Sequence, residues 1–251
     1  MKKKKFAVFC PVKDETTFSP VWLAYYSRFL SVEDIYFLDF NSEIKPTGCR
    51  VVHTERNILD AVELFEAIKE FHKKLLEEYE YVIPTDVDEI IYHPEGLDNY
   101  IHKLDKDFVK CTGYEIIHLP NKEPEFDGSK PIFSQRNFWV RSNYYNKTLI
   151  TNKPINWCIG LHENMDEIKS QTKIPLEKDL LLLHLHRFDF NICTERHIRY
   201  SKLKWSSNTV KNNYNWHYRK QSKEEIEKWY FATHNQPIIE IPQHIKDSVG
   251  I

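Results

Sequence analysis

The sequence predicts an α/β protein with a mixed, mostly parallel central sheet flanked by helices. Short apolar runs and helical segments alternate over residues 1–105 in the order β-α-β-β-α-β-α, which is typical of a parallel sheet with helices on both faces. Beyond residue 105, strand-like segments between polar loops dominate before helical spacing returns. The 251 residues are 41% hydrophobic and include no long Gly/Ser/Pro linker, so we expect one domain over residues 1–251.

The elements of the first half follow from their apolar patterns. Residues 6–12 form a short apolar run before a charged loop, which indicates a buried strand. Apolar residues at helical spacing predict helices over residues 18–30 and 58–79, the second with Asn57 as its N-cap. The other expected elements are strands at residues 34–40, 50–54 and 81–84, and a short helix opened by Pro94 and Glu95 that ends near residue 104.

The second half has a different character. Polar loops, such as the Pro/Gly/acid segment at residues 121–130, separate apolar runs that predict strands. The strands expected here cover residues 108–119, 132–140, 147–150 and 180–185. Helical spacing returns at residues 194–205 and 223–231, so we expect two helices near the end of the chain.

Composition excludes several classes of protein. Lys and Arg number 35 against 37 Asp and Glu, and no basic stripe is present, so we expect no nucleic-acid partner. No stretch approaches the roughly 18 apolar residues of a transmembrane helix, and the N-terminal residues make a poor signal peptide. The five cysteines are odd in number and lack a C-x-x-C motif, which indicates reduced thiols. These features favour a cytoplasmic protein, and work at a membrane surface stays open.

An acidic cluster follows the strand expected at residues 81–84. Asp86, Asp88 and Glu89 fall within four residues at the carboxyl end of that strand, where open α/β sheets bind ligands. Carboxylates this close repel one another unless they face water or share a divalent cation, and Mg²⁺ and Mn²⁺ prefer such oxygens. If the strand continues, its alternation points both aspartates the same way. A solvated acidic turn is the alternative interpretation.

Two stretches, VKDETTFSPVWLAYYSRFLSVEDIYFLDFNS and YVIPTDVDEIIYHPEG, resemble family 2-like glycosyltransferases. The resemblance covers residues 6 to about 105 well and the rest loosely. It implies a GT-A fold, with a nucleotide-sugar-binding half over about 1–105 and an acceptor half over about 106–251. It also implies Mn²⁺- or Mg²⁺-dependent transfer of a sugar, with inversion, from a nucleotide-diphosphate sugar. A UDP-sugar is the expected donor, and the acceptor is a hydroxyl of a glycan, a lipid-linked glycan or a protein.

The resemblance assigns roles to residues of the first half. The residues that would line the nucleoside pocket are Pro11, Val12, Lys13 and Glu15. Asp39 would contact the base or ribose, Asp86 the ribose or the metal, and Asp88 would ligate the metal. Electrostatics also favours a metal ion here, because a diphosphate and a pair of carboxylates repel each other unless a cation lies between them.

The second half leaves the remaining metal ligand open. The resemblance implies a late histidine at the metal, and two places compete for that role. His162 follows a glycine in a turn-like setting, whereas His184 and His186 lie on one face of an expected strand. For each of these histidines, an ordinary structural role is the alternative.

The second half must also supply the general base, because an inverting transferase needs one within hydrogen-bond reach of the acceptor hydroxyl. Glu163 and Glu115 are the candidates, and the alternative for each is a surface or ion-paired carboxylate. Lys147 and Arg187 are candidates to neutralise the diphosphate, and the alternative for each is an ordinary solvated charge.

Two other functions stay open. A relative of the same fold that binds nucleotide sugars or glycans without catalysis would lack a usable base. A nucleotidyltransferase or phosphohydrolase also gathers acidic residues at strand ends. The absence of a Gly-rich phosphate loop from the sequence disfavours this second class.

Overall fold

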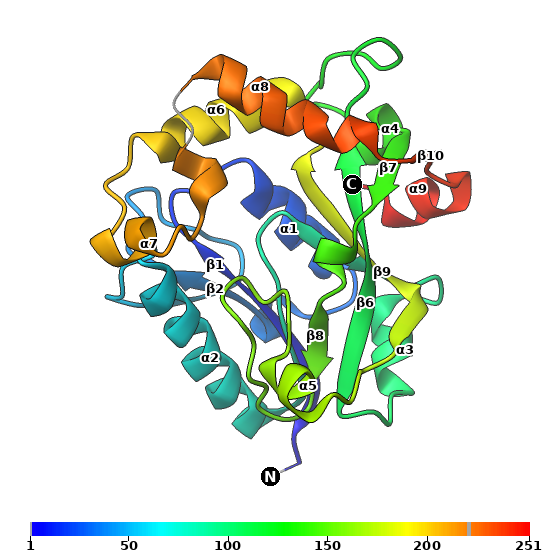
Figure 1. Cartoon of the computed structure of the whole chain (residues 1–251). Coiled ribbons are helices and arrows are strands. Elements are labelled where there is room, and N and C mark those ends of the chain that lie inside the picture. The colour runs from blue at the N-terminus through cyan, green and yellow to red at the C-terminus, as the bar shows by residue number, and fades with distance from the viewer. Residues whose placement is uncertain (1, 220–221) are drawn as a thin grey trace.

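A single mixed sheet runs through the computed structural model, which describes residues 2–219 and 222–251 (Figure 1). Its ten described strands follow the order β10-β7-β6-β8-β4-β1-β2-β3, and β9 joins by pairing with β6 and β5. The strands are β1 (Lys4–Val12), β2 (Ile35–Asp39), β3 (Arg50–His53), β4 (Tyr79–Pro84), β5 (Glu89–Tyr92), β6 (Phe108–Ile117), β7 (Phe138–Arg141), β8 (Thr148–Thr151), β9 (Leu176–Arg187) and β10 (Ile238–Glu240).

Nine α-helices and four 3-10 turns connect the strands within the described ranges. The α-helices are α1 (Phe18–Tyr26), α2 (Ala61–Glu78), α3 (Leu97–His102), α4 (Ile132–Gln135), α5 (Met165–Ser170), α6 (Phe190–Ser201), α7 (Ser207–Lys211), α8 (Lys223–Phe231) and α9 (Gln243–Val249). The 3-10 turns are η1 (Val32–Asp34), η2 (Asn143–Tyr145), η3 (Trp216–Arg219) and η4 (Ala232–Asn235).

The first half of the chain forms the parallel part of the sheet. β3, β2, β1 and β4 lie side by side, with Val8 of β1 opposite Ile35 of β2 and Ile83 of β4. Every residue of β2 is buried, as expected for a parallel strand that is covered on both faces. The predicted alternation of strands and helices is confirmed, with β5 as an additional strand before α3.

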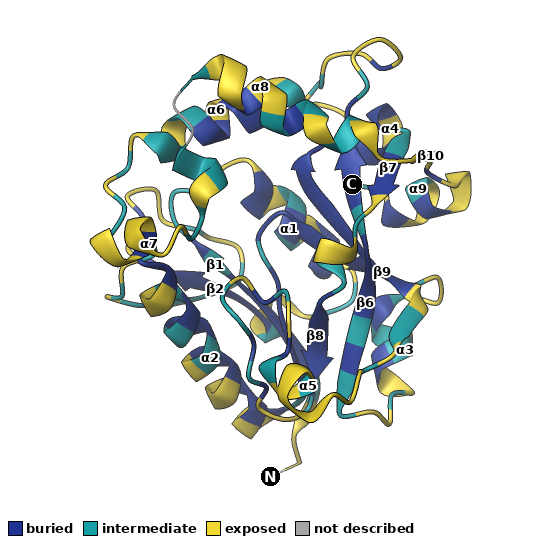
Figure 2. Ribbon diagram, viewed as in Figure 1, coloured by how far each residue is buried: buried dark blue, intermediate teal, exposed yellow. Residues whose placement is uncertain are grey.

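Helices cover both faces of this parallel part. The ring of Tyr36 lies 5.7 Å from Phe71 of α2, and the ring of the next residue, Phe37, lies 5.4 Å from Trp22 of α1. Because consecutive residues of a strand point to opposite faces, α1 and α2 pack on opposite sides of β2. Figure 2 shows how α2 turns buried residues toward the sheet and exposed residues outward.

The second half corrects the expectation of a mostly parallel sheet. Here β8 is antiparallel to β4 and β6, β7 is antiparallel to β6, and β10 is antiparallel to β7. The β6–β9 pair is the parallel exception. A parallel neighbour requires a long crossover, usually a helix, and the only helical pieces of the described segment between β6 and β8 are the four-residue α4 and the turn η2, on either side of β7.

The strand directions bring four carboxyl ends to one edge of the sheet. β8 runs antiparallel to both β4 and β6, so β6 has the same direction as β4 and β1. β9 is parallel to β6 and therefore ends at that edge too. The loop after β1 and the acidic segment after β4 thus meet the ends of β6 and β9.

Several element boundaries differ from those predicted. Residues 132–140 were expected to be one strand, but α4 and β7 occupy them, and Gln135 of α4 holds the preceding turn through Asp127 and Lys130. α1 ends at Tyr26 and α3 begins only at Leu97, after Gly96. The elements that the sequence did not predict are β5, β10, α5, α7 and α9.

Two helix starts differ because a side-chain cap decides them. α2 begins after Asp60, whose carboxylate accepts hydrogen bonds from the backbone N–H groups of Val62 and Glu63, so Asn57 is not its cap. α6 begins at Phe190 rather than at residue 194, because Asp189 accepts from the backbone N–H of Ile192.

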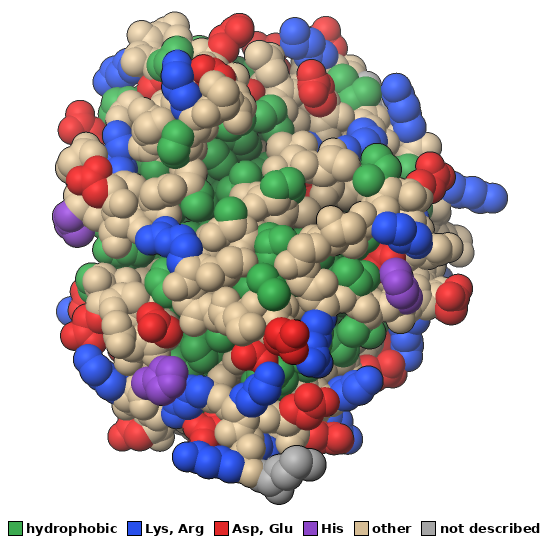
Figure 3. Space-filling view, turned by 180° about the vertical axis from the view of Figure 1, so that it is seen from behind, with side chains coloured by type: hydrophobic (Ala, Val, Ile, Leu, Met, Phe, Trp, Pro, Cys, Tyr) green, Lys and Arg blue, Asp and Glu red, His purple; other side chains and the backbone are tan. Residues whose placement is uncertain are grey.

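The outer surface carries charges of both signs. On the face shown in Figure 3, Lys and Arg side chains alternate with Asp and Glu side chains over the lower part of the molecule. That face therefore presents no continuous basic stripe. Among the helices that the structure describes, none has both the length and the apolar character that a bilayer crossing requires.

Candidate functional site

A cavity of about 610 Å³ opens at the edge where the carboxyl ends of β1, β4, β6 and β9 meet. Its lining includes the loop after β1, the acidic segment after β4, the ends of β6 and β9, and parts of α2 and α6. Residues 144–145, 159–162 and 213–218 and Trp229 of α8 also line it. Small-molecule sites typically enclose about 300–1,000 Å³, so the cavity is large enough for a ligand of that class.

Most of the site residues predicted from the sequence line this cavity. They are Pro11, Val12, Lys13, Glu15, Asp86, Asp88, Glu115, His162, His184, His186 and Arg187. Three predicted residues do not line it, namely Asp39, Lys147 and Glu163.

Asp39 is buried beneath the edge of the sheet and is engaged within the chain. Its Oδ1 accepts a hydrogen bond from the backbone N–H of Ser42 at 3.0 Å, and its Oδ2 lies 2.8 Å from His53 Nδ1. Burial opposes ionisation, but the hydrogen bonds from Ser42 and His53 hold the pKa of Asp39 below its usual range. These contacts organise the loop after β2, and the contact of Asp39 with a nucleoside stays a prediction.

Glu163 and His162 are neighbours with different surroundings. The side chain of Glu163 is exposed, whereas His162 lines the cavity and packs against the ring of Tyr144 at 3.7 Å. His162 Nδ1 lies 3.0 Å from the carbonyl oxygen of Tyr144, so that nitrogen donates. Burial and the charge of Lys147 lower the pKa of His162 to about 2. His162 is therefore neutral, and neither residue belongs to the cluster around Asp88.

The loop after β1 is held by its own charged residues. Lys13 Nζ donates to the carbonyl oxygens of Phe40 and Asn41, at 3.2 and 3.0 Å. Glu15 is buried, and its Oε1 accepts from the backbone N–H groups of Thr17 and Phe18 at the start of α1. One wall of the cavity is thus fixed to the ends of β2 and α1.

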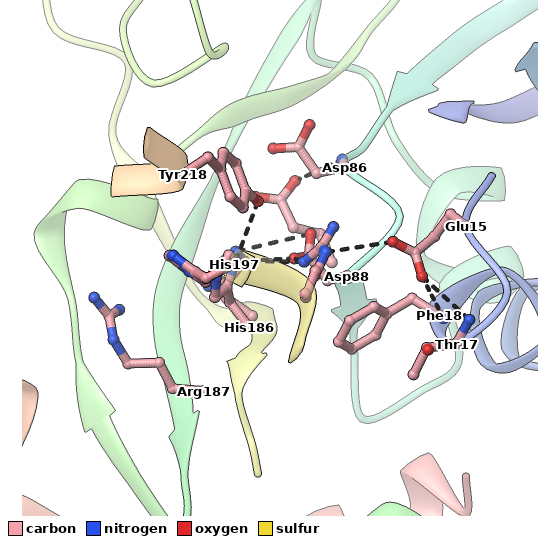
Figure 4. Close-up of polar contacts among 12 residues, drawn as sticks. Glu15, Thr17, Phe18, Asp86, Asp88, His186, Arg187, His197 and Tyr218 are labelled. Carbon is pink, nitrogen blue, oxygen red and sulfur yellow. Dashed lines mark hydrogen bonds and ion pairs between the residues drawn. The ribbon is translucent and has the colours of Figure 1, made fainter. Parts of the chain in front are cut away.

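Asp88 is a buried carboxylate surrounded by nitrogen atoms. Its Oδ2 pairs with Arg196 Nη1 and lies 3.3 Å from His186 Nδ1, and its Oδ1 lies 3.9 Å from His184 Nε2. Figure 4 shows Asp88, His186 and Tyr218 turned toward one another, with Arg187 off to one side. Burial opposes the charge, but Arg196, His184 and His186 hold the pKa of Asp88 well below its usual range. Asp88 is therefore ionised.

Asp86 and Asp88 do not point the same way, because β4 ends at Pro84 and the strand alternation stops there. The Asp86 side chain is 43% exposed and lies 3.0 Å from Lys147 Nζ, which is itself fully buried. Lys147 also lies 2.6 Å from the buried carboxylate of Glu89. Burial disfavours its charge, but Asp86 and Glu89 raise the pKa of Lys147. Lys147 therefore neutralises this acidic pair from below the cavity.

Glu115, at the end of β6, joins two residues from the end of β9. Its Oε1 lies 2.9 Å from His184 Nδ1, and its Oε2 accepts from Arg187 Nη1 at 2.8 Å. Despite burial, His184 and Arg187 lower the pKa of Glu115. Burial likewise disfavours the imidazolium, but Glu115 and Asp88 raise the pKa of His184. The ring of Tyr145 stacks on His184 at 4.1 Å and fixes its plane.

The residues present fit a divalent cation at Asp88. Donor atoms of Asp88, His184 and His186 lie within 4.8 Å of one another, and all three residues are buried. His184 Nδ1 faces Glu115, which turns Nε2 toward Asp88, as is usual for metal-binding histidines. Asp86 is drawn toward Lys147, so Asp88 Oδ1 and His184 Nε2 face each other as donors, while His186 Nδ1 lies beside Asp88 Oδ2. Imidazole is a usual ligand of transition metals, whereas Mg²⁺ takes oxygen ligands.

Sequence reasoning missed several residues of the cavity. Arg196 lies in a segment predicted as a helix, but the sequence contains many cations and does not say which one pairs with Asp88, 108 positions away. The guanidinium of Arg187 stacks on the ring of Trp229 at 3.7 Å, and Trp229 also lines the cavity. The sequence offers only a general signal for such a residue: a carboxylate that is buried is expected to pair with a cation.

Comparisons with solved structures give partial likenesses. No protein-family model and no curated protein matches the chain. A solved structure of TarS, a glycosyltransferase of S. aureus, superposes with a TM-score of 0.41 at 13% identity, and covers 98% of this chain and 50% of TarS. A structure of TarS residues 1–349 gives a TM-score of 0.36 at 13% identity, over 98% of this chain and 82% of that fragment. The chain is thus similar to these structures in part, and it spans half the length of the first.

Proposed function

We propose that this chain is a glycosyltransferase of GT-A fold that moves a sugar from a nucleotide-diphosphate sugar to an acceptor hydroxyl. The observation that most supports this proposal is the meeting of the loop after β1 with Asp86 and Asp88 in one cavity. In open α/β sheets, nucleotide ligands bind at this carboxyl edge. The acceptor classes are a glycan, a lipid-linked glycan or a protein.

The donor is proposed to lie between the loop after β1 and the acidic segment after β4. Pro11, Val12 and Lys13 would face its nucleoside, and the half-exposed carboxylate of Asp86 would meet its ribose. A UDP-sugar is the donor we test first. Arg187 lines the cavity, its side chain is nine-tenths buried, and its Nε has no hydrogen-bond partner among the described residues, so its guanidinium is proposed to meet a diphosphate oxygen.

A divalent cation is proposed to bind at Asp88 and His184, with His186 beside them. When bound, Mn²⁺ or Mg²⁺ would act as a Lewis acid on the departing diphosphate. The chain's own residues prepare this place: Glu115 fixes the tautomer of His184, and Arg196 holds Asp88 through Oδ2 and leaves Oδ1 toward His184.

Glu115 is proposed as a positioning residue rather than the general base. It is 1% exposed, and both of its oxygens already bind His184 and Arg187, so no oxygen is available to an acceptor hydroxyl. Glu163 as the base stays a prediction, and its exposed position outside the cavity lining speaks against it.

The acceptor is proposed to enter along the aromatic side of the cavity. Tyr200, Trp205, Tyr218 and Trp229 line it, and Trp216 lines it while 48% exposed. Aromatic rings offer broad apolar faces, which suit the C–H faces of a sugar acceptor.

The test is donor binding and turnover by the full chain. Melting temperatures are measured with UDP-, GDP- and dTDP-sugars, each with and without Mn²⁺, because a ligand of the folded state raises the melting temperature. Release of free nucleoside diphosphate in the presence of oligosaccharide acceptors reports transfer. We expect one nucleotide class to act only together with Mn²⁺. Asp88→Asn is expected to lose both responses, and Asp166→Asn, a surface change in α5, to keep them.

A second candidate function is nucleotide-sugar binding without transfer, favoured by the engagement of Glu115 and the exposed position of Glu163. A metal-dependent thermal shift with no release of nucleoside diphosphate, with any acceptor or with water, would select it. No shift with any nucleotide sugar, while the protein is folded, would contradict both functions.

A further inference from the structure

Two imidazole rings meet head to head behind Asp88. His186 at the end of β9 and His197 of α6 are both buried, and their Nε2 atoms lie 2.9 Å apart. His197 Nδ1 lies 3.0 Å from the carbonyl oxygen of His217, which only accepts, so this nitrogen carries the hydrogen. His197 Nε2 therefore presents a lone pair to His186.

The contacts of His186 Nδ1, its other ring nitrogen, decide whether His186 Nε2 also presents a lone pair. Its Nδ1 lies 3.3 Å from Asp88 Oδ2, an acceptor, and 3.4 Å from both Arg196 Nη1 and the Tyr218 hydroxyl. When Nδ1 donates to Asp88, the two Nε2 lone pairs face each other and can bind one cation; when Nδ1 instead accepts from Arg196 or Tyr218, His186 Nε2–H donates to His197. An imidazole that gives its Nδ1–H to a carboxylate or a backbone carbonyl is the usual state of a metal-binding histidine.

A third donor lies at the same place. Cys193 is one turn before His197 on the same face of α6, and its Sγ and one ring nitrogen of each histidine lie within 4.8 Å of one another. The Cys193 side chain is 1% exposed and forms no disulfide. Burial, opposed by Arg187 and Arg196, raises the pKa of this thiol to about 12, so only a bound cation would make it a thiolate near neutral pH.

We propose that His186 Nε2, His197 Nε2 and Cys193 Sγ form a zinc site, separate from the cation of the proposed function. Two nitrogens and one sulfur suit Zn²⁺, which binds at about 2.0–2.1 Å from nitrogen and about 2.3 Å from sulfur. Tetrahedral ligation places two such nitrogens about 3.3 Å apart, so the rings would separate by a few tenths of an ångström. Binding displaces the thiol proton of Cys193 to solvent.

Such a site would tie three parts of the fold together. His186 belongs to β9, Cys193 and His197 to α6, and the carbonyl of His217 connects η3. It would thereby fix the element that carries Arg196 against the strand that carries His184. The position of Asp88 between them depends on that arrangement.

Cobalt spectroscopy separates this site from one without a thiolate. The full chain, reduced and freed of metal, is titrated with Co²⁺ and then with Zn²⁺. We expect a near-ultraviolet thiolate-to-cobalt charge-transfer band that saturates at one equivalent and disappears when Zn²⁺ is added. Cys193→Ser should abolish the band, and Cys111→Ser, which alters an equally buried thiol in β6, should keep it.

A further variant separates this proposal from the proposed function. His184→Gln removes a ligand of the Asp88 cation and is expected to keep the charge-transfer band while donor-dependent shifts are lost. If Cys193→Ser does not fold, the wild-type thiol is read instead: in urea near the unfolding midpoint, where the buried Cys193 becomes accessible, Zn²⁺ should slow its alkylation, measured by peptide mass. A wild-type chain without the band would overturn the zinc site and leave an ordinary hydrogen bond between the two Nε2 atoms. A band that survives Cys193→Ser would also overturn it, because another cysteine would then be the ligand.

Discussion

Asp86 and Asp88 are two residues apart and have opposite surroundings. Asp88 is buried and its charge depends on Arg196, whereas Asp86 is half exposed above Lys147, which keeps Glu89 as a second partner. Removing one member of a buried ion pair leaves an uncompensated charge, and that costs far more than losing an exposed pair. The two aspartates therefore differ in what they contribute to stability.

We expect Asp88→Asn to lower the free energy of unfolding by about 3 kcal/mol, because Arg196 stays buried without its main counter-charge. Asp86→Asn is the matched control and should cost less than about 1 kcal/mol, since Lys147 still contacts Glu89 at 2.6 Å. Urea denaturation followed by circular dichroism measures both values. Equal losses for the two variants would contradict the environments described here.

At the scale of elements, a close backbone approach joins β6 to η2. A Cβ placed on Gly113 would lie 2.4 Å from the backbone carbon of Tyr145, so only glycine permits this contact. Tyr145 in turn stacks on His184 at 4.1 Å. The packing of η2 on β6 thus orients a histidine of the candidate site.

Gly113→Ala is expected to destabilise the protein by about 2 kcal/mol or more, because the clash is with backbone and cannot be relieved by a rotamer change. Gly128→Ala is the control, since the nearest atom to its added Cβ is 3.9 Å away, and we expect it to stay within about 0.5 kcal/mol of wild type. Thermal unfolding compares the two. An unchanged melting temperature for Gly113→Ala would show that η2 does not pack this closely.

The start of α2 depends on its cap. Asp60→Ala should cost about 1 kcal/mol, because the N–H groups of Val62 and Glu63 lose their acceptor. Asn57→Ala, at the cap predicted from sequence, should cost less, since Asn57 accepts only from Leu59 before the helix begins. Chemical denaturation measures the free energy of unfolding of both variants. A larger loss for Asn57→Ala than for Asp60→Ala would place the cap at Asn57.

At the scale of the whole molecule, buried neutral histidines connect stability to pH. His72 of α2 is 1% exposed, and its Nε2 lies 2.7 Å from the hydroxyl oxygen of Thr151 in β8. Burial lowers the pKa of His72 to about 3. In the unfolded chain this histidine is protonated below about pH 6.5, whereas in the folded chain it stays neutral down to about pH 3. The free energy of unfolding therefore falls as the pH drops from about 6.5 toward 3.

We expect His72→Gln to flatten this dependence by up to about 1.4 kcal/mol per pH unit between pH 6 and 4. The readout is the free energy of unfolding from urea curves at several pH values, compared with wild type. His244→Gln changes an exposed histidine and should leave the slope as it is. A wild-type slope in His72→Gln would mean that His72 is protonated in the folded chain.

The sequence by itself determined the features that neighbouring residues encode. The alternation of strands and helices over residues 1–105, the helix at residues 223–231 and the position of Asp86 and Asp88 after a buried strand are all readable from periodicity. The tertiary structure decided the rest: the antiparallel second half, the choice of His184 and His186 over His162 beside Asp88, and the pairing of Asp88 with Arg196. The physical reason is distance along the chain, because periodicity is a local property, whereas the partner of a buried charge is selected by packing among residues more than a hundred positions apart.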